Sequence, residues 1–202
     1  MSQPTFYYFD GRGKGELIRL LLTYFEVKFT DIRINDINEL PQNILDQLPF
    51  GQVPYYIDEK IQLSQSLAIQ LYLANKFNFT GGDNNEEQKA ISNSIVNVAP
   101  DVLDHLYKTL NLGASVDDFK NKIIPKFVGR LETLLTKNGG KFFVGTQLSY
   151  ADLAIFNVVD NLLYFGFNDQ LSTYTNLLSQ HKSISSLPQL VSYLENRPKA
   201  TF

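Results

Sequence analysis

Residues 48–77 read LPFGQVPYYIDEKIQLSQSLAIQLYLANKF, and this stretch decides the fold of the first half of the chain. Its Pro49-Phe50-Gly51 sequence is typical of a turn. Two short runs of strand-forming residues follow, Tyr55–Ile57 and Ile61–Leu63, with charged residues between them. Because such paired runs with a short polar connection form hairpins, the stretch predicts a turn followed by a β-hairpin.

The same stretch ends in a predicted helix. Leu67, Leu71 and Ala74 are apolar residues at helical spacing. Ser66 precedes them and is a candidate N-cap, since a serine hydroxyl accepts a hydrogen bond from an amide of the first turn. A helix N-terminus carries free N–H groups and a partial positive charge, which favour a bound carboxylate.

The Val53–Pro54 bond is a second feature suited to binding. A cis bond here would turn the N–H and C=O of Val53 outward, where a peptide could pair with them, although most bonds before proline are trans. The residues alone leave two interpretations open. One is a peptide-binding edge beside a carboxylate site, and the other is a turn, a hairpin and a capped helix without a ligand.

Composition excludes several classes of function. The chain has 202 residues, 44% of them hydrophobic and 19% charged, which is ordinary for a globular protein of one or two domains. Its formal net charge of −3 gives no basic surface for nucleic acid or anionic membrane. It contains no cysteine, so disulfides, thiolate zinc sites and cysteine nucleophiles are excluded. No signal-peptide pattern and no apolar run of about 18 residues occurs, and we expect a cytoplasmic protein.

The first half of the chain alternates strand and helix patterns. Residues 5–9 are a β-favouring aromatic run, apolar residues recur at helical spacing over 17–25, and residues 27–32 form a second strand pattern. Residues 35–47 are polar and predict an irregular segment or short helix. With the hairpin and the helix after it, the order is β-α-β-α-β-β-α, which is thioredoxin-like.

The second half of the chain predicts helices only. The small, polar residues 80–85 read as a linker, which divides the chain into domains at 1–79 and 84–202. Pro100 and Pro125 lie within helical patterns and are expected to bend them. The helical patterns cover residues 86–112, 116–136, 148–164, 171–179 and 187–194.

Four segments carry a family resemblance: LPFGQVP, QSLAI, TFYYFDGRGKGELIRLLL near the start and LPQLVSYLENRPKATF at the end. Together they resemble the cytosolic glutathione S-transferases, the sigma class in particular, over nearly the full length. The resemblance implies a thioredoxin-like α/β N-terminal domain, an all-α C-terminal domain, a cis bond before Pro54 and a homodimer. It also implies an enzyme that joins glutathione, its co-substrate, to small hydrophobic electrophiles without a further cofactor.

Tyr8 is the candidate catalytic residue. Strand alternation places Tyr8 with Phe6 on one face and Tyr7 on the other. The residues alone also allow a core or cross-strand aromatic at position 8, but the resemblance implies that Tyr8, not Tyr7, donates a hydrogen bond to the glutathione thiolate. A free thiol has a pKa near ~8.5, and lowering it by about two units requires roughly 2.7 kcal/mol. One hydrogen bond to a charged group supplies about 1.5–3 kcal/mol, so a protonated Tyr8 that donates can provide most of the effect.

The resemblance also implies a glutathione site along the decisive stretch. Gln52 and Val53, before Pro54, are expected to pair with the cysteinyl part of glutathione. Gln65 and Ser66 are expected to bind its γ-glutamyl carboxylate, in agreement with the physical interpretation of the helix start.

Three more residues complete the predicted glutathione site. Asp101 matches an aspartate that reaches the γ-glutamyl amine of a ligand in the partner subunit, Lys14 stands where the sigma pattern has arginine, and Leu40 lies in the segment before the turn. That segment departs from the sigma pattern, because no lysine or arginine occurs between Arg33 and Lys60 to hold the glycine carboxylate.

The second substrate is expected to contact Phe9, Gly11, Leu103 and Tyr107. The absence of tryptophan argues against prostaglandin isomerisation of the sigma type, which stays an alternative activity. A crystallin-like or hydrophobic-ligand-binding protein without turnover is a third interpretation.

Two other clusters are interpreted as structural. Ser149 and Asp152 have the spacing of a capping box at a helix start. Asp101, Asp104 and His105 share a helix face but offer too few ligands, so we predict no metal site.

Overall fold

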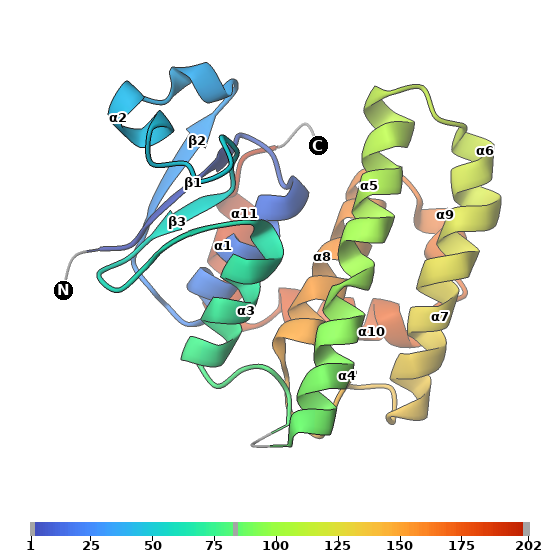
Figure 1. The fold of residues 1–202 in the computed structure, drawn as a ribbon. Helices are drawn as coiled ribbons and strands as arrows, with labels where there is room; N and C mark the ends of the chain where they lie inside the picture. The colour runs from blue at the N-terminus through green and yellow to red at the C-terminus, as the bar shows by residue number, and fades with distance from the viewer. Residues whose placement is uncertain (1–2, 83–84, 200–202) are drawn as a thin grey trace. The chain divides into compact units, whose positions relative to one another are not determined.

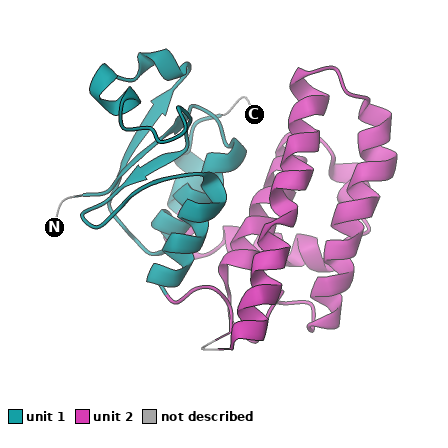
Figure 2. Ribbon diagram, viewed as in Figure 1, with its two compact units in different colours: residues 1–77, 192–202 teal, residues 78–191 magenta. Residues whose placement is uncertain are grey.

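The computed structural model describes residues 3–82 and 85–199, and the chain forms two compact units (Figure 2). Unit 1 contains residues 1–77 together with 192–202, and unit 2 contains residues 78–191. The segment at the C-terminus is therefore part of unit 1. The domain limits expected from the sequence, 1–79 and 84–202, stay a prediction, and residues 83 and 84 of the predicted linker lie outside the described residues.

Unit 1 is built on a four-stranded sheet with the order β2-β1-β3-β4 (Figure 1). The strands are β1 (Thr5–Phe9), β2 (Thr30–Ile34), β3 (Tyr55–Ile57) and β4 (Gln62–Ser64). β1 pairs in parallel with β2 and antiparallel with β3, and β3 pairs antiparallel with β4. The predicted hairpin and the parallel crossover are confirmed.

The helices of unit 1 follow the apolar spacing of the sequence. They are α1 (Glu16–Tyr24), α2 (Gln42–Leu45) and α3 (Ser66–Lys76), with short 3-10 turns η1 (Gly13–Gly15) and η2 (Ile37–Glu39). Figure 1 shows α1 and α3 side by side. The first seven residues of α1 are all buried, including two charged ones, so this helix forms the centre of the unit.

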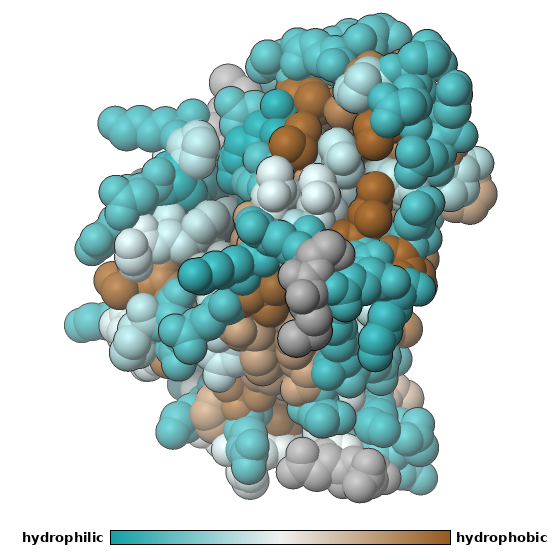
Figure 3. Space-filling model, turned by 90° about the vertical axis from the view of Figure 1, so that its left-hand side faces the viewer, coloured by the Kyte–Doolittle hydropathy of each residue, from teal (hydrophilic) through white to brown (hydrophobic). Residues whose placement is uncertain are grey.

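Hydrophobic side chains also remain at the surface of unit 1. On the side of the molecule seen in Figure 3, they appear as patches separated by hydrophilic side chains. The exposed large hydrophobic residues of this unit include Phe9, Phe50, Leu67 and Leu71.

All regular secondary structure in the described residues of unit 2 is helical, as predicted. Its centre is α8, because nearly every residue of this helix is buried. The elements are α4 (Glu86–Val96), α5 (Val98–Asn111), α6 (Val116–Asp118), the π-helical turn η3 (Phe119–Ile123), α7 (Ile124–Lys137), α8 (Tyr150–Tyr164), α9 (Asn168–Leu171), α10 (Thr175–Ser185) and the first part of α11 (Pro188–Asn196). None of the helices among the described residues has the length and apolar character needed to span a membrane.

The two prolines act where the sequence predicted a bend. α4 ends at Val96, whose carbonyl would accept from the N–H that Pro100 lacks, and α5 begins two residues later. Likewise Pro125 follows the wider turn η3 at the start of α7. The two proline-containing helices expected from the sequence, 86–112 and 116–136, are therefore divided.

The predicted capping box at the start of α8 is present. Asp152 accepts hydrogen bonds from the backbone N–H and the hydroxyl of Ser149, at 2.7 and 2.8 Å. It also accepts from the Phe143 N–H at 2.8 Å and the Gln180 side-chain amide at 2.9 Å. This buried carboxylate joins three segments of unit 2.

Candidate active site

Tyr8 lies on the buried face of β1, next to Phe6. Burial alternates along the strand, and Tyr7 points to the opposite face, where its ring packs 6.1 Å from that of Tyr55. The predicted alternation is confirmed. The side chain of Tyr8 is 9% exposed, so little of it is accessible.

The hydroxyl of Tyr8 meets the start of the following helical turn. It accepts a hydrogen bond of 3.0 Å from the backbone N–H of Lys14, within η1. A hydrogen bond accepted by a phenol oxygen polarises the O–H group, and chains of hydrogen bonds strengthen one another in a low-dielectric setting. The geometry therefore makes Tyr8 a stronger hydrogen-bond donor.

Two glycines allow this approach. A Cβ on Gly15 would lie 2.3 Å from Cδ1 of Tyr8, and a Cβ on Gly13 would lie 2.7 Å from its hydroxyl oxygen. Gly13 also has a φ of 36°, in the left-handed region that side chains disfavour. The loop after β1 is therefore glycine-rich because the tyrosine ring lies directly against its backbone.

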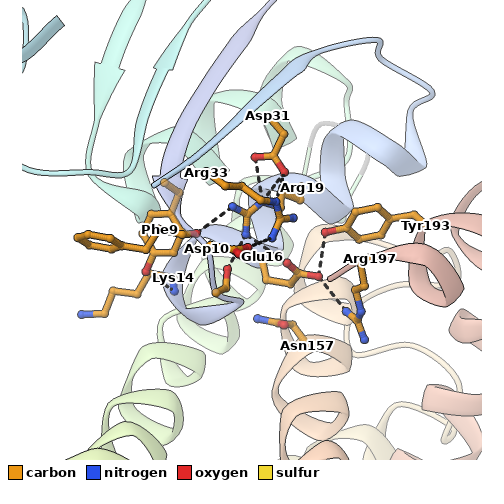
Figure 4. A network of polar contacts seen from close by, with 12 residues as sticks. Phe9, Asp10, Lys14, Glu16, Arg19, Asp31, Arg33, Asn157, Tyr193 and Arg197 are labelled. Carbon is orange, nitrogen blue, oxygen red and sulfur yellow. Dashed lines mark hydrogen bonds and ion pairs between the residues drawn. The ribbon is translucent and has the colours of Figure 1, made fainter. Parts of the chain in front are cut away.

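Arg19 supports the same loop from inside the unit (Figure 4). It is fully buried, and its guanidinium carbon lies 5.4 Å from the ring centre of Phe6 and 5.7 Å from that of Tyr8. Nη1 donates to the carbonyl of Gly11 at 2.7 Å, and Nη2 donates to the carbonyl of Phe9 at 3.2 Å. One side chain thus contacts the loop backbone at two points and the tyrosine ring at a third.

Carboxylates balance the charge of Arg19. Its Nε donates to both oxygens of Asp31 at 3.1 Å, and Nη1 lies 3.5 Å from Glu16 Oε2. Asp31 also pairs with Arg33, which bonds Asp10. Burial acts to lower the pKa of Arg33, but the charge of Asp31 together with Tyr193 and the hydrogen bonds to Asp10 and Asp31 outweighs it, and the pKa is raised. A buried charge without a partner is costly, so these groups hold one another in place.

Glu16, Arg19 and the glycine contacts were not among the residues singled out from the sequence. One signal for them exists. Residues 16–22, ELIRLLL, place two charges three apart in an otherwise apolar helix, and charges are rarely fully buried unless they are paired. That pattern indicates a buried ion pair but gives no information about its distant partners.

The predicted glutathione segment has the expected backbone. The Val53–Pro54 bond is cis, Pro54 is buried and Gln52 is exposed. Gln65 has a φ of 74° and precedes α3, with its side chain exposed. Long side chains rarely take this conformation, and such residues cluster at binding sites.

The prediction that Ser66 is an N-cap is wrong. Ser66 is the first residue of α3, and Gln65 takes the cap position without a side-chain hydrogen bond to the helix. The left-handed turn at Gln65 brings the chain into the helix one residue earlier than the sequence indicated. Both residues remain at the start of α3, where the first-turn amides have no partner within the helix.

Two other predicted glutathione residues have contrasting surroundings. Lys14 is exposed. The side chain of Leu40 is 4% exposed and lies in a core cluster with Ile34, Leu48 and Tyr55. Any contact of Leu40 with glutathione would therefore use its backbone.

The remaining predicted residues are distributed over the two units. In unit 1, Phe9 is exposed and Gly11 is buried. On α5 of unit 2, Asp101 and Tyr107 are exposed, whereas Leu103 is buried. The residues described contain no group of three or more histidine, cysteine or acidic side chains suited to a metal ion.

Comparison with known proteins agrees with this geometry. The profile of the glutathione S-transferase N-terminal domain matches residues 4–75, and that of the C-terminal domain matches residues 101–197. A glutathione S-transferase of Plasmodium yoelii yoelii is 33% identical over 198 residues, which are 95% of this chain and 92% of that relative. The chain belongs to the glutathione S-transferase family. The transferase is accordingly an enzyme that uses glutathione as co-substrate, and its Tyr8 and α3 lie in the N-terminal domain of that family.

Solved structures support the same fold. A pi-class glutathione S-transferase of Onchocerca volvulus has a TM-score of 0.86 at 29% identity, covering 97% of the transferase and 94% of that chain. A sigma-class enzyme of Fasciola hepatica has a TM-score of 0.84 at 28% identity, covering 99% of both chains. Because two classes match almost equally well, the fold does not distinguish between them.

Proposed function

We propose that the transferase conjugates the glutathione thiolate to small hydrophobic electrophiles and that the Tyr8 hydroxyl stabilises this thiolate. The hydrogen bond from the Lys14 N–H to the Tyr8 hydroxyl carries the proposal. It orients the phenol and strengthens its O–H as a donor. Tyr8 stays protonated in this mechanism, and the thiol of glutathione loses its proton to solvent.

A single donor is sufficient for the required shift. Moving the thiol pKa from ~8.5 to about 6.5 corresponds to roughly 2.7 kcal/mol. A hydrogen bond to a charged acceptor contributes about 1.5–3 kcal/mol, and partial burial of Tyr8 favours the upper part of that range. No base is needed, since preorganised donation to the sulfur anion is enough.

The proposed glutathione site extends from Tyr8 to α3. The backbone of Val53 pairs with the cysteinyl part of the peptide, with Gln52 beside it. The γ-glutamyl carboxylate is held by Gln65, Ser66 and the first-turn amides of α3. The left-handed φ of Gln65 supports this assignment, because the strain is explained if the residue is selected for binding.

Further contacts are proposed for glutathione and for the electrophile. Lys14 and the backbones of Leu40 and Pro54 complete the site in the same subunit. We propose a sigma-like homodimer in which Asp101 of one subunit meets glutathione in the other. The electrophile contacts Phe9, Gly11, Leu103 and Tyr107, and the exposed rings of Phe9 and Tyr107 offer apolar surface to a flat substrate.

Tyr8→Phe tests the proposal, with Tyr7→Phe as the matched control on the opposite face of β1. We expect Tyr8→Phe to bind a glutathione resin almost as well as the wild type and to lose about 10–100-fold in conjugation of chlorodinitrobenzene. Tyr7→Phe should keep both properties. Full turnover in Tyr8→Phe would refute the role of Tyr8. Wild-type binding without turnover would indicate a ligand-binding protein instead.

A further inference from the structure

Glu16 connects the start of α1 with the C-terminal segment of unit 1. Its side chain is 1% exposed. Oε1 accepts a hydrogen bond of 3.0 Å from the hydroxyl of Tyr193 and one of 2.8 Å from Nη1 of Arg197 (Figure 4). These donors lie 177 and 181 residues away along the chain. Tyr193 and Arg197 therefore contact the helix that follows the Tyr8 loop.

The other side of Glu16 faces that loop. Its Oε2 lies 3.5 Å from Nη1 of Arg19, and the same nitrogen donates to the carbonyl of Gly11. Glu16 also follows Gly15 directly, and Gly15 is the residue whose backbone lies against the Tyr8 ring. A displacement of Glu16 would therefore move both the support of the loop and the surface on which the tyrosine rests.

The network is balanced in charge and largely buried. Its three guanidinium groups and three carboxylates belong to Arg19, Arg33, Arg197, Asp10, Glu16 and Asp31. Burial, and then the charge of Glu16, raise the pKa of Tyr193 far above its ordinary value, so this phenol stays protonated and donates. Removing one partner would leave a buried carboxylate undercompensated, and the local backbone would have to move to admit water.

We propose that Tyr193 and Arg197 are positioning residues for the transferase reaction, because through Glu16 they hold the start of α1 and the Lys14 N–H in register with Tyr8. The inference rests on the proposed role of Tyr8 in stabilising the thiolate. Neither residue touches the reacting atoms. Their effect reaches the chemistry through the direction and strength of the Tyr8 hydrogen bond.

A positioning role and a purely structural role predict different results. Replacing a residue with a purely structural role would change the stability of the protein and leave the pKa of the bound glutathione thiol unchanged. A positioning residue would change the pKa of the bound thiol, while the peptide contacts near Gln65 keep glutathione affinity nearly constant. The ultraviolet absorbance of the thiolate, titrated with pH in the protein–glutathione complex, measures that pKa directly.

Arg197→Met and Tyr193→Phe are the test variants in the full-length chain. Arg197→Met keeps an apolar stem and removes the charge, whereas Tyr193→Phe removes one hydroxyl only. We expect Arg197→Met to raise the pKa of bound glutathione by about one unit, which from a wild-type value of about 6.5 is roughly threefold less thiolate at pH 7, and Tyr193→Phe to have a smaller effect in the same direction. At about pH 5.5, where the bound thiol is protonated in both proteins, the dissociation constant of glutathione should change by less than about twofold.

Arg197→Lys is the rescue variant. It restores the charge without the planar fork, and we expect it to recover part of the shift. Glu195→Gln and Asn196→Ala are matched controls on the same segment, since both side chains are exposed, and neither should change the thiol pKa.

Each outcome bears on the inference. An unchanged thiol pKa in folded Arg197→Met and Tyr193→Phe would overturn it, as would an equal shift in the controls. If Arg197→Met fails to fold, Tyr193→Phe and Arg197→Lys decide the question by the same titration. If wild-type protein binds glutathione with a thiol pKa near ~8.5, the proposed function itself fails, and this inference fails with it. A lowered wild-type pKa that is unaffected by the variants leaves the proposed function standing and refutes the positioning role alone.

Discussion

The backbone of Gly15 lies so close to the ring of Tyr8 that a Cβ at this position would come within 2.3 Å of Cδ1. The two residues are in contact because β1 turns directly into η1 and α1. Alanine at position 15 can be accepted only if the tyrosine ring moves, since the atoms it meets belong to a rigid ring that stacks with Phe6 and contacts the guanidinium of Arg19.

Gly15→Ala is therefore predicted to reduce conjugation without unfolding the transferase. A displacement of about 1 Å at a reacting group can cost on the order of 10²-fold in rate, and we expect a loss of that size in kcat/KM with chlorodinitrobenzene. Gly129→Ala is the control, because Gly129 lies inside α7 and a Cβ there makes only ordinary contacts with Tyr174. Wild-type rates in Gly15→Ala would contradict this prediction, because they would show that the Tyr8 ring accommodates the added Cβ without loss of activity.

Gln65→Gly should separate stability from binding. Glycine adopts the φ of 74° without strain, so the variant should unfold at an equal or higher urea concentration, with a change of at most about 1 kcal/mol. The same variant loses the amide that is proposed to contact the γ-glutamyl group, and glutathione affinity should fall about tenfold. Calorimetric titration measures the second effect. Unchanged affinity would remove Gln65 from the glutathione site.

Asp58 is predicted to make the hairpin between β3 and β4 sensitive to acid. It accepts hydrogen bonds from Tyr72 at 2.9 Å, Lys76 at 2.6 Å and the N–H groups of Lys60 and Ile61 at 2.8 and 3.0 Å. Burial acts to raise the pKa of Asp58, but the hydrogen bond and charge of Lys76 and the other donors outweigh it, and the pKa lies well below its usual range. The folded state therefore stabilises the charged carboxylate of Asp58 more than the unfolded state does.

A lowered pKa in the folded state contributes stability above the unfolded value of ~3.9 and loses it as the pH falls below that value. Asp58→Asn should thus be less stable than wild type by about 2–3 kcal/mol at pH 7, and the difference should shrink under acidic conditions. Urea unfolding at pH 7 and under acidic conditions measures this difference. Asp117 is exposed, so Asp117→Asn is the control, and its stability should lie within about 0.5 kcal/mol of wild type. A difference independent of pH would contradict the charge-based account.

Asp152 should have the opposite pH dependence. Burial raises its pKa to about 6, although hydrogen bonds from Phe143, Ser149 and Gln180 act to lower it. Its contribution to stability is then fully present below the unfolded value of ~3.9 and is lost as the pH rises through about 6. We expect Asp152→Asn to be less stable than wild type at low pH, because its amide has one accepting oxygen and its NH2 group would face donors, and to lack the decline in stability between pH ~4 and about 6. Thermal unfolding across that range measures both features.

Local sequence signals account for most of the fold. The aromatic run at residues 5–9, the paired runs around Asp58 and the apolar spacing of α1 and α8 are all short-range patterns, and each predicted element is present. Helix boundaries were less well predicted. Pro100 divides a long helical pattern at a carbonyl four residues upstream, and the left-handed turn at Gln65 moves the start of α3 by one residue. Such boundaries depend on which backbone conformation the neighbouring elements impose.

By itself, the sequence determined the order of strands and helices, the buried face that carries Tyr8 and the cis bond implied by the family pattern, because periodicity, turn residues and motif spacing are properties of neighbouring residues. The tertiary structure alone decided what surrounds that tyrosine. Gly15 contacts its ring, Arg19 holds its loop, and Arg197 reaches Glu16 from the far end of the chain. Contacts across such separations depend on how the elements pack and on the need to pair every buried charge, and neither can be read from local pattern.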